Sequence, residues 1–477
     1  MKLHFANLAA LVAVAHAVIQ LPGVPFKSPV VVAPGFTARV IFSNLTAPRG
    51  VAFDSKENIL VVERGLGVSV FSQSLATPVN AWNRELVIKN ADLTHGIQIE
   101  GNKLYVSTAK DVLLYSWDPA TRTVGSAAPY PVVTGLPADG ELTTHTLYLE
   151  PGATRSNGML IGSGPLTNID LTARDPASGR SQIRRFVWPN ITLPVYPPIP
   201  SRWENGQVIA YGIRNPAGFA YPTGPSVTPV NSRDLYVVEN GASIDEVTGL
   251  TPAFVNDNPA DELELVNYPT VTSSAVPKSY GFPDCTTLWN GSADPIGVPK
   301  YVGLPSGTQI SLNLDKSRDD AFCAKTPALN QPPAHSVPLD IKFYTPPTVS
   351  GPATLPNTLA NSAFVSFHGS FDRKPPTGYG VVNVPFPIKK VSSTPLGYSF
   401  IVQAKDLNSC PGSCIRPVGL AFSADGKLYV SSDSSGEASP GYFQLSVIET
   451  ESASFYSCSS SRGPNLQQVD CYPWTNE

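Results

Sequence analysis

A hairpin pattern recurs six times along the 477-residue chain, and this repetition limits the possible folds more than any other feature. Each copy has a small or polar residue, an apolar strand, a turn with Gly, Asp or Asn, and a second strand of the Leu-Tyr-Val type. Because a lone hairpin with one buried face is at best marginally stable, the copies must pack on one another. The copies begin at Pro48, Thr94, Thr144, Ile213, Val337 and Arg416.

The repetition predicts an all-β fold, a six-bladed β-propeller, because a ring of four-stranded blades leaves only short edges exposed. The 48 prolines, 37 glycines and two methionines are typical of a loop-rich β protein. The long interval at about 249–336 has no apolar periodicity sustained enough for a core of its own. We therefore expect a single domain over residues 18–477, with 249–336 as an insertion on one rim, where it would help to build a binding surface.

The first 17 residues are typical of a secretory signal peptide. Lys2 precedes an apolar run that ends in the small-x-small triplet Ala15-His16-Ala17. No later stretch approaches the roughly 18 uninterrupted apolar residues of a membrane-spanning helix. We therefore expect a secreted, extracellular protein without a membrane partner.

The six cysteines and three glycosylation sequons agree with that compartment. Local clustering of the cysteines predicts three disulfides. The expected pairs are Cys285–Cys323, Cys410–Cys414 and Cys458–Cys471, and the sequons lie at Asn44, Asn190 and Asn290.

Charge and missing motifs exclude several functions. A net charge of −4, 15% charged residues and no long basic run argue against nucleic-acid binding. The chain lacks the G-x-S-x-G, H-E-x-x-H, P-loop and G-x-G-x-x-G patterns. Serine hydrolase, zinc protease and nucleotide-dependent functions therefore have little support.

The residues that open the copies should gather at one mouth of the central channel, since the inner strand of every blade runs along it. Several guanidinium groups brought close together repel one another and lose hydration unless an anion neutralises them. The planar arginine fork suits carboxylates. We therefore expect a small polyanionic ligand there, although any single arginine could instead pair with an acid or a loop carbonyl. The openers are Arg49, His95, His145, Arg214 with Asn215, Pro338 with Leu339, and Arg416.

Two segments carry a resemblance to a known family. "GIRNPAGFA" (212–220) resembles the Arg-Asn-Pro-x-Gly signature of the soluble glucose and sorbosone dehydrogenases that use pyrroloquinoline quinone (PQQ). "FVSFHGSFDRKPPTGYGVV" (364–382) resembles their His-Gly-Ser-aromatic-Asn-Arg segment. "PRGVAFDSKENILVVE", "NPADELELV" and "YGFPDC" match in the same order, so the resemblance runs from about 31 to 433. It is closest to the secreted fungal pyranose dehydrogenase branch.

The resemblance implies a site for PQQ, a tricarboxylate, and for calcium. A calcium ion would lie against the quinone, partly through the carbonyls of Gly241 and Ala242. Asp261 and Glu262 would serve a second, structural calcium, unless they belong to a solvated loop. The cofactor-binding residues would be Arg49, Arg214, Asn215, Arg373 and Arg416, with His368 beside them.

The implied reaction is oxidation of a sugar at its anomeric carbon, in which a histidine takes the hydroxyl proton. The family's base usually opens blade three as His-x-Thr-Arg-Thr-Leu, whereas "ELTTHTLYLE" places Leu142 at the histidine position and His145 at the arginine position. A three-residue offset turns the imidazole to the other face unless a bulge intervenes. The candidate bases are therefore His145 and His95, and either could instead be a hydrogen-bonded channel histidine.

Two alternatives to the dehydrogenase remain. The displaced histidine leaves room for an inactive or binding-only relative. A calcium-dependent propeller lactonase would need acids where this chain has arginines.

A dehydrogenase would need a sugar substrate and an external electron acceptor, namely a small quinone, a cytochrome or a copper oxygenase, because no C-x-x-C-H haem motif is present. Asp372, in place of the usual Asn, could compete for Arg373.

Overall fold

The computed structural model describes most of the chain between residues 18 and 473. The described ranges are 18–20, 26–73, 82–151, 158–187, 199–222, 232–269, 277–326, 332–348, 351, 354–388, 397–433, 444–450, 456–460 and 469–473. The predicted signal peptide (1–17) and the sequon at Asn190 lie outside these residues.

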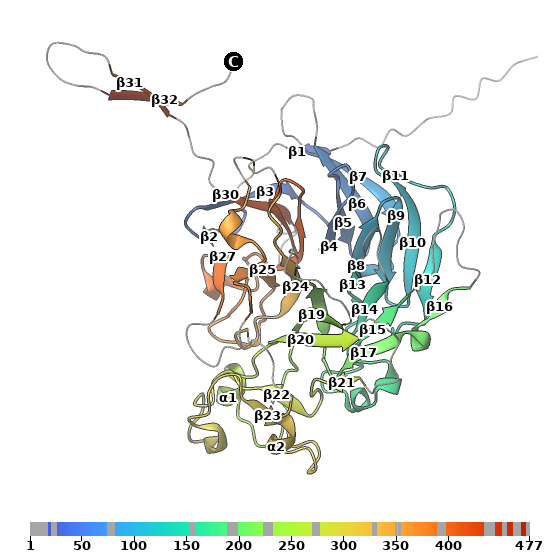
Figure 1. The fold of residues 1–477 in the computed structure, drawn as a ribbon. Coiled ribbons are helices and arrows are strands. Elements are labelled where there is room, and N and C mark those ends of the chain that lie inside the picture. Colours follow the sequence, from blue (N-terminus) through green and yellow to red (C-terminus); the bar gives the residue numbers. More distant parts are fainter. Residues whose placement is uncertain are drawn as a thin grey trace, which may run out of the picture.

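Six blades surround a central axis, as the repeat predicted (Figure 1), and their strands are antiparallel except for the outermost pairs β12–β16 and β17–β21. Each copy supplies the first two strands of one blade. Because successive inner strands run in the same direction along the axis, their first residues lie at one end. The inner strands are β4 (Pro48–Phe53), β8 (Leu93–Glu100), β13 (Leu147–Leu149), β18 (Pro216–Ala220), β24 (Pro338–Phe343) and β28 (Pro417–Phe422).

The remaining strands extend each blade outward. Blades one to three add β5 (Ile59–Glu63), β6 (Gly67–Gln73), β7 (Trp82–Lys89) and β1 (Val18–Gln20); β9 (Lys103–Thr108), β10 (Asp111–Asp118), β11 (Thr123–Val124), β12 (Tyr130–Thr134) and β16 (Ser201–Arg202); and β14 (Met159–Ser163), β15 (Gln182–Phe186), β17 (Gln207–Tyr211) and β21 (Lys278–Ser279). Blades four to six add β19 (Ser232–Glu239) and β20 (Glu262–Pro269); β25 (Ala363–Phe367), β26 (Gly380–Val384), β27 (Ser399–Ala404) and β2 (Val30–Val32); and β29 (Leu428–Ser432), β30 (Gln444–Thr450) and β3 (Phe36–Ser43).

The ring is closed by pairing the two ends of the propeller sequence. β3 from the N-terminal region lies antiparallel to β30, with Phe36 opposite Thr450 and Ser43 opposite Gln444. Val40, Ile41 and Phe42 of β3 are buried. Blade six is therefore built from both ends of the chain, and β3 covers the edge that β30 would otherwise expose.

Glycines close behind the openers allow neighbouring inner strands to approach closely. A Cβ on Gly50 would lie 2.3 Å from the carbonyl oxygen of His95, and one on Gly419 would lie 2.4 Å from that of Arg49. Any larger residue would push the strands apart. The same is true of Gly96, whose Cβ would lie 2.6 Å from the His145 oxygen. These glycines hold the openers of adjacent blades near one another.

The segment 249–336 is only partly an insertion. It supplies β20 to blade four and β21 to the edge of blade three. Its other elements gather at one end of the ring (Figure 1). They are α1 (Pro252–Asn256), β22 (Cys285–Thr287), β23 (Gln309–Ser311) and α2 (Asp320–Cys323), with the 3-10 turn η4 (Pro299–Tyr301). The further 3-10 turns of the described chain are η1 (Leu171–Arg174), η2 (Pro176–Ser178), η3 (Trp203–Asn205), η5 (Asn357–Leu359) and η6 (Leu407–Ser409).

The insertion has a small apolar core, which the sequence did not predict. Phe254, Leu288, Tyr301 and Ile310 are buried against one another there. These residues come from short, separate pieces, so their sequence shows no period. The predicted Cys285–Cys323 disulfide joins β22 to α2 and holds these pieces together.

The other two cysteine predictions have different outcomes. Cys410 and Cys414 form the second expected disulfide. Cys458 and Cys471 are opposite each other in the pairing of β31 (Tyr456–Ser460) with β32 (Val469–Pro473), where the side chains are not described. That disulfide stays a prediction. The helices of the described chain are all too short or too polar to cross a membrane.

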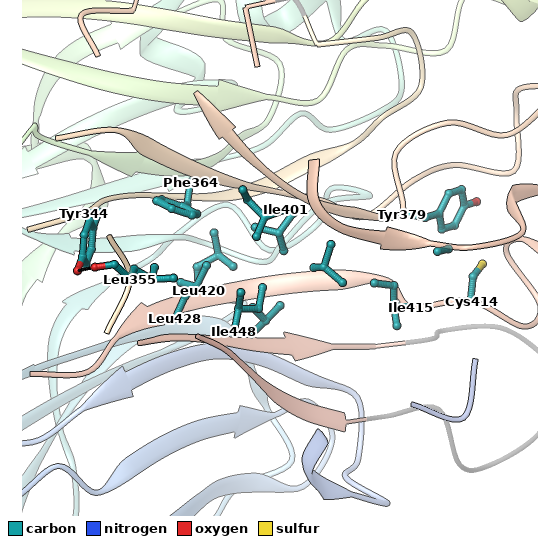
Figure 2. Packing of buried hydrophobic residues seen from close by; sticks show 14 residues of the cluster. Tyr344, Leu355, Phe364, Tyr379, Ile401, Cys414, Ile415, Leu420, Leu428 and Ile448 are labelled. Atoms are coloured by element: carbon teal, nitrogen blue, oxygen red, sulfur yellow. Dashed lines mark hydrogen bonds between the residues drawn. The ribbon is translucent and has the colours of Figure 1, made fainter. Parts of the chain in front are cut away.

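Apolar side chains fill the spaces between blades. Figure 2 shows the cluster between blades five and six, where Phe364, Ile401 and Leu420 lie close together. The Phe364 ring is fully buried and meets Phe422 edge to face, with centroids 5.4 Å apart. Such inter-blade clusters keep the inner strands at fixed positions around the axis.

We predict that Phe364→Ala lowers the free energy of unfolding by about 3–5 kcal/mol, because it removes a buried ring and leaves a cavity. Urea unfolding followed by tryptophan fluorescence would measure the change. Phe371→Ala is the matched control, since Phe371 is 69% exposed and its loss should change the free energy by less than about 0.5 kcal/mol. Equal losses in the two variants would contradict the proposed packing.

Candidate functional site

Five of the six inner strands have a register shift close to their first residue. The shifts lie between Pro48 and Val51, Leu93 and Ile97, Pro216 and Gly218, Pro338 and Asp340, and Pro417 and Leu420. A bulge breaks the alternation of side chains and changes the direction of the residue that it contains. Arg49 and His95 lie within such shifts, so these two openers are freed from the strict alternation of their strands.

Two openers, Arg49 and Arg416, gather with His368 around Asp433, which follows β29. Nη1 of Arg49 donates to Oδ2 of Asp433 at 2.5 Å, and Nε2 of His368 lies 2.5 Å from Oδ1. Nη2 of Arg416 lies 2.9 Å from Nδ1 of His368. All four side chains are buried, and they come from blades one, five and six. We call these four residues the axial group.

The hydrogen bonds decide where the proton of His368 lies. Because arginine only donates, Nδ1 of His368 must accept from Arg416, and the ring proton therefore sits on Nε2 and faces Asp433. Burial, with some help from Arg416, lowers the pKa of His368 to about 4 even though Asp433 acts to raise it. Burial acts to raise the pKa of Asp433, but Arg49 and His368 hold it well below its usual range. His368 is neutral and Asp433 is ionised at neutral pH.

Arg49 retains donor capacity for a ligand. Its guanidinium bonds to Asp433 through Nη1, while its Nε is buried without a hydrogen-bond partner. A buried donor left unpaired costs about 1–3 kcal/mol, which an anionic ligand would offset. This orphaned N–H fits the carboxylated ligand that the sequence predicted.

Arg214 and Asn215 belong to a second group, which involves blades three and four. Nε and Nη2 of Arg214 donate to the carbonyl and Oδ1 of Asn168 at 3.0 and 3.1 Å, and Nη1 donates to the carbonyl of Asn240 at 3.4 Å. Asn215 donates to Oδ1 of Asn240 at 2.7 Å. Asn240 in turn donates to the carbonyl of Pro338 at 2.5 Å, which ties this group to the inner strand of blade five. The guanidinium of Arg214 has carbonyl and amide partners there, and burial lowers its pKa.

Arg373 lies apart from both groups in its contacts. Its Nη2 donates to Asp257 at 2.5 Å and its Nη1 to the carbonyl of Ala334 at 3.5 Å, both within the insertion. Its Nε is buried without a partner. The acid paired with Arg373 is therefore Asp257 and not Asp372, which the sequence had suggested as the competitor.

The geometry of His145 argues against its predicted role as the base. Its Nδ1 lies 3.0 Å from the carbonyl oxygen of Gly162, and its Nε2 lies 3.0 Å from that of Ala109. The ring is 3% exposed and joins blades two and three. Burial lowers its pKa. Because both nitrogens face backbone oxygens, neither is available for a substrate proton.

His95, the second candidate, lies close to the axial group. It is 6% exposed, and its Nδ1 is buried without a hydrogen-bond partner. Burial and the charges of Arg49, Lys342 and Arg64 lower its pKa well below the usual value, while Asp433 opposes them. Of the two predicted bases, only His95 keeps a ring nitrogen that is not used by the protein.

Three glutamates of blade four form a buried acidic cluster. One carboxylate oxygen from each of Glu239, Glu262 and Glu264 lies within 4.8 Å of the others. Glu239 faces Glu262 across β19 and β20, and Glu264 follows on the same side of the strand. Oε2 of Glu239 and Oε1 of Glu264 have no hydrogen-bond partner. Three oxygen donors at this spacing could hold a hard divalent cation.

Asp261 and Glu262, which were predicted to bind one metal ion together, have different partners in the structure. Oδ1 of Asp261 accepts from the N–H of Gly241 at 2.9 Å, and Oδ2 accepts from the N–H of Val337 at 2.7 Å and from Ser336 at 3.0 Å. Asp261 therefore ties loops together, and only Glu262 belongs to the cluster. Gly241 and Ala242 follow β19 as expected, and Asp261 holds the loop that contains them through the N–H of Gly241.

Sequence reasoning missed Asp433, Glu239, Asn240 and Glu264. The first three stand at the end of the second strand of a copy, in "LYVSSD" and "LYVVEN". In an antiparallel hairpin this position lies opposite the first residue of the inner strand, as Pro216 lies opposite Glu239. The repeat itself contained this signal, since both strands of each copy meet at the same mouth.

The fold and site together define a six-bladed propeller with cationic side chains from separate blades at one end of its axis. The family described as TrAA12-like matches residues 30–439, and the chain belongs to this family. It is 32% identical over 428 residues to a pyrroloquinoline quinone-dependent sugar dehydrogenase of Hypocrea jecorina, covering 87% of this chain and 89% of that protein. It is 30% identical to a pyrroloquinoline quinone-dependent pyranose dehydrogenase of Coprinopsis cinerea, covering 88% of this chain and 55% of that protein.

Solved structures agree with this assignment. A calcium structure of the Trichoderma reesei family AA12 enzyme superposes with a TM-score of 0.73 at 30% identity, covering 89% of this chain and 98% of that one. The holo form of the pyranose dehydrogenase PQQ domain from Coprinopsis cinerea gives 0.72 at 27% identity, covering 90% and 98%.

We predict that the metal-free protein loses stability as pH rises. Burial and repulsion from Glu262 raise the pKa of Glu239 and Glu264 well above the ordinary 4.5. Because the folded-state pKa is higher than the unfolded one, the free energy of unfolding is greatest below pH 4.5 for these groups and falls as pH rises through the folded pKa. Urea unfolding in EDTA at pH 5 and 8 would measure the fall.

Glu264→Gln should reduce this pH dependence, because it removes one of the repelling charges. Glu204→Gln, at an exposed carboxylate of η3, is the control and should leave the pH dependence as in the wild type. Equal slopes in Glu264→Gln and the wild type would contradict the prediction.

Proposed function

We propose that this protein is a secreted quinoprotein that oxidises a sugar, a pyranose or 2-keto aldose, at the anomeric carbon, with PQQ and calcium as cofactors and an external electron acceptor. One observation carries the proposal, namely the buried, partnerless Nε of Arg49 within the axial group. A ligand with several carboxylates would supply the missing acceptor. The named activities of the two curated relatives support the same class of ligand.

Residues of the axis would hold the cofactor by charge and hydrogen bonds. Arg49 offers its Nε–H, and Arg416 adds positive charge from blade six. Arg214 and Asn215 would bind from blade four, and Arg373 would do so through its own partnerless Nε. When bound, PQQ would supply the acceptor for the hydride that leaves the sugar carbon.

His95 would take the proton of the sugar hydroxyl at an imidazole nitrogen. Its low pKa has two main causes, burial and the positive charge of Arg49. A polyanion bound at the axis would offset that charge and move the pKa of His95 back toward neutrality, where a base is most effective at neutral pH. His95 would thus be a weak base in the protein without cofactor, and binding of the cofactor would raise its pKa.

Calcium would fit the three glutamates, and Gly241 and Ala242 follow Glu239 by two and three residues in the chain. Glu239 connects the glutamate cluster to Arg214, because its Oε1 accepts from the backbone N–H of Arg214 at 2.6 Å. Cation binding would remove the repulsion within the cluster and hold the backbone of Arg214 in place.

Reconstitution tests the proposal. The purified protein, given PQQ and calcium, should show the absorbance of bound quinone and should reduce a dye when a pyranose is added. Binding without dye reduction would support the binding-only relative, an alternative that stands because both ring nitrogens of His145 face backbone oxygens. Hydrolysis of a sugar lactone with calcium alone would instead support the lactonase.

We predict that His95→Gln lowers kcat by about 100- to 10,000-fold, the usual contribution of a general base, while the dissociation constant for PQQ changes little. His145→Gln should lower the melting temperature and change kcat by a smaller factor, because His145 joins two blades. Steady-state dye reduction and quinone titration would measure both effects. A larger loss of kcat in His145→Gln than in His95→Gln would reverse the assignment.

A further inference from the structure

Asp433 is the carboxylate that joins the cationic groups of the axial group. It is 1% exposed, and its two oxygens contact different partners, Arg49 of blade one and His368 of blade five, each at 2.5 Å. Its backbone N–H donates to the carbonyl of Arg416 at 3.1 Å. One residue of blade six thus fixes side chains from the blades on both sides of it.

The contact between Asp433 and Arg49 leaves the Nε–H of the guanidinium without a partner in the protein. Asp433 takes Nη1 alone, so Nε remains for a ligand. The contact with His368 has a similar effect, because it holds the proton on Nε2 and leaves Nδ1 to accept from Arg416. Arg416 is in turn held against the ring and the carbonyl of Gly369 at 2.9 Å.

We propose that Asp433 is a positioning residue for the axial site, which orients Arg49 directly and Arg416 through His368, so that the Nε–H of Arg49 is directed toward a carboxylated ligand. The inference rests on the proposed function for the identity of that ligand. The arrangement of Asp433, Arg49, His368 and Arg416 does not depend on the proposed function, because it can be measured in the protein without cofactor.

The sign of one measurement separates positioning from simple electrostatics. Asp433→Asn removes a negative charge beside the site, so Coulomb attraction alone would make PQQ bind more tightly. Positioning predicts the opposite. An asparagine has one acceptor oxygen and cannot satisfy both Arg49 and the Nε2–H of His368, so the group loses its arrangement.

The experiment compares the wild type, Asp433→Asn, Asp433→Glu and Asp425→Asn in full-length protein. Quinone titration by absorbance should give a dissociation constant at least 10-fold weaker in Asp433→Asn and partly restored in Asp433→Glu. Asp425→Asn is the matched control, because Asp425 lies in the same blade but is 55% exposed and pairs with Lys427. Its dissociation constant should equal that of the wild type. Unchanged or tighter binding in Asp433→Asn would overturn the proposal.

A second readout uses protein without PQQ. Nitrogen-15 NMR of the imidazoles should place the proton of His368 on Nε2 in the wild type and Asp425→Asn, and should show a changed tautomer or a mixture in Asp433→Asn. An unchanged His368 signal would overturn the positioning role.

If the wild type fails to bind PQQ, the proposed function fails, and the NMR result alone then decides the role of Asp433. If Asp433→Asn does not fold, Asp433→Glu gives the same two measurements, with weaker binding and a shifted His368 signal expected, and wild-type values in both would overturn the proposal.

Discussion

The site depends on cationic side chains being held close together, inside the protein, at one end of the propeller axis. Arg49 pairs with the ionised carboxylate of Asp433, and the buried Arg416 lies close enough for that carboxylate to act on its pKa. Burying charges in this way is costly unless each has a partner. The six inner strands form a rigid ring that fixes the position of each group, so the charged side chains stay close together despite this cost. The excess of positive charge makes the axis suited to a small polyanion.

The close approach of the inner strands is what makes that crowding possible. Gly50, Gly96 and Gly419 stand where a side chain would collide with the neighbouring blade. The inter-blade apolar clusters hold the strands at that distance, as in Figure 2. Packing far from the axis and chemistry at the axis are therefore coupled through the spacing of the blades.

The insertion contributes to the site as well as to the rim. It supplies Asp257 and Ala334, which hold Arg373, and Gln309 and Thr287, which bond to Glu262 in the acidic cluster. The blade strands provide the charged groups, while the insertion determines how some of them are directed. This division explains why a segment with no sequence period lies beside two parts of the site.

The sequence by itself determined the blades and the openers, because a hairpin repeat is a local pattern and every copy presents its first residue at the same end. It also predicted two disulfides that the structure contains. The tertiary structure decided what those residues contact. The nitrogens of His145 are taken by carbonyls of Gly162 and Ala109, Asp261 ties loops while Glu262 joins two other glutamates, and Asp433 organises the axial group. These outcomes depend on atoms from different blades or from strands paired within a blade, whose distance in space cannot be read from their spacing along the chain.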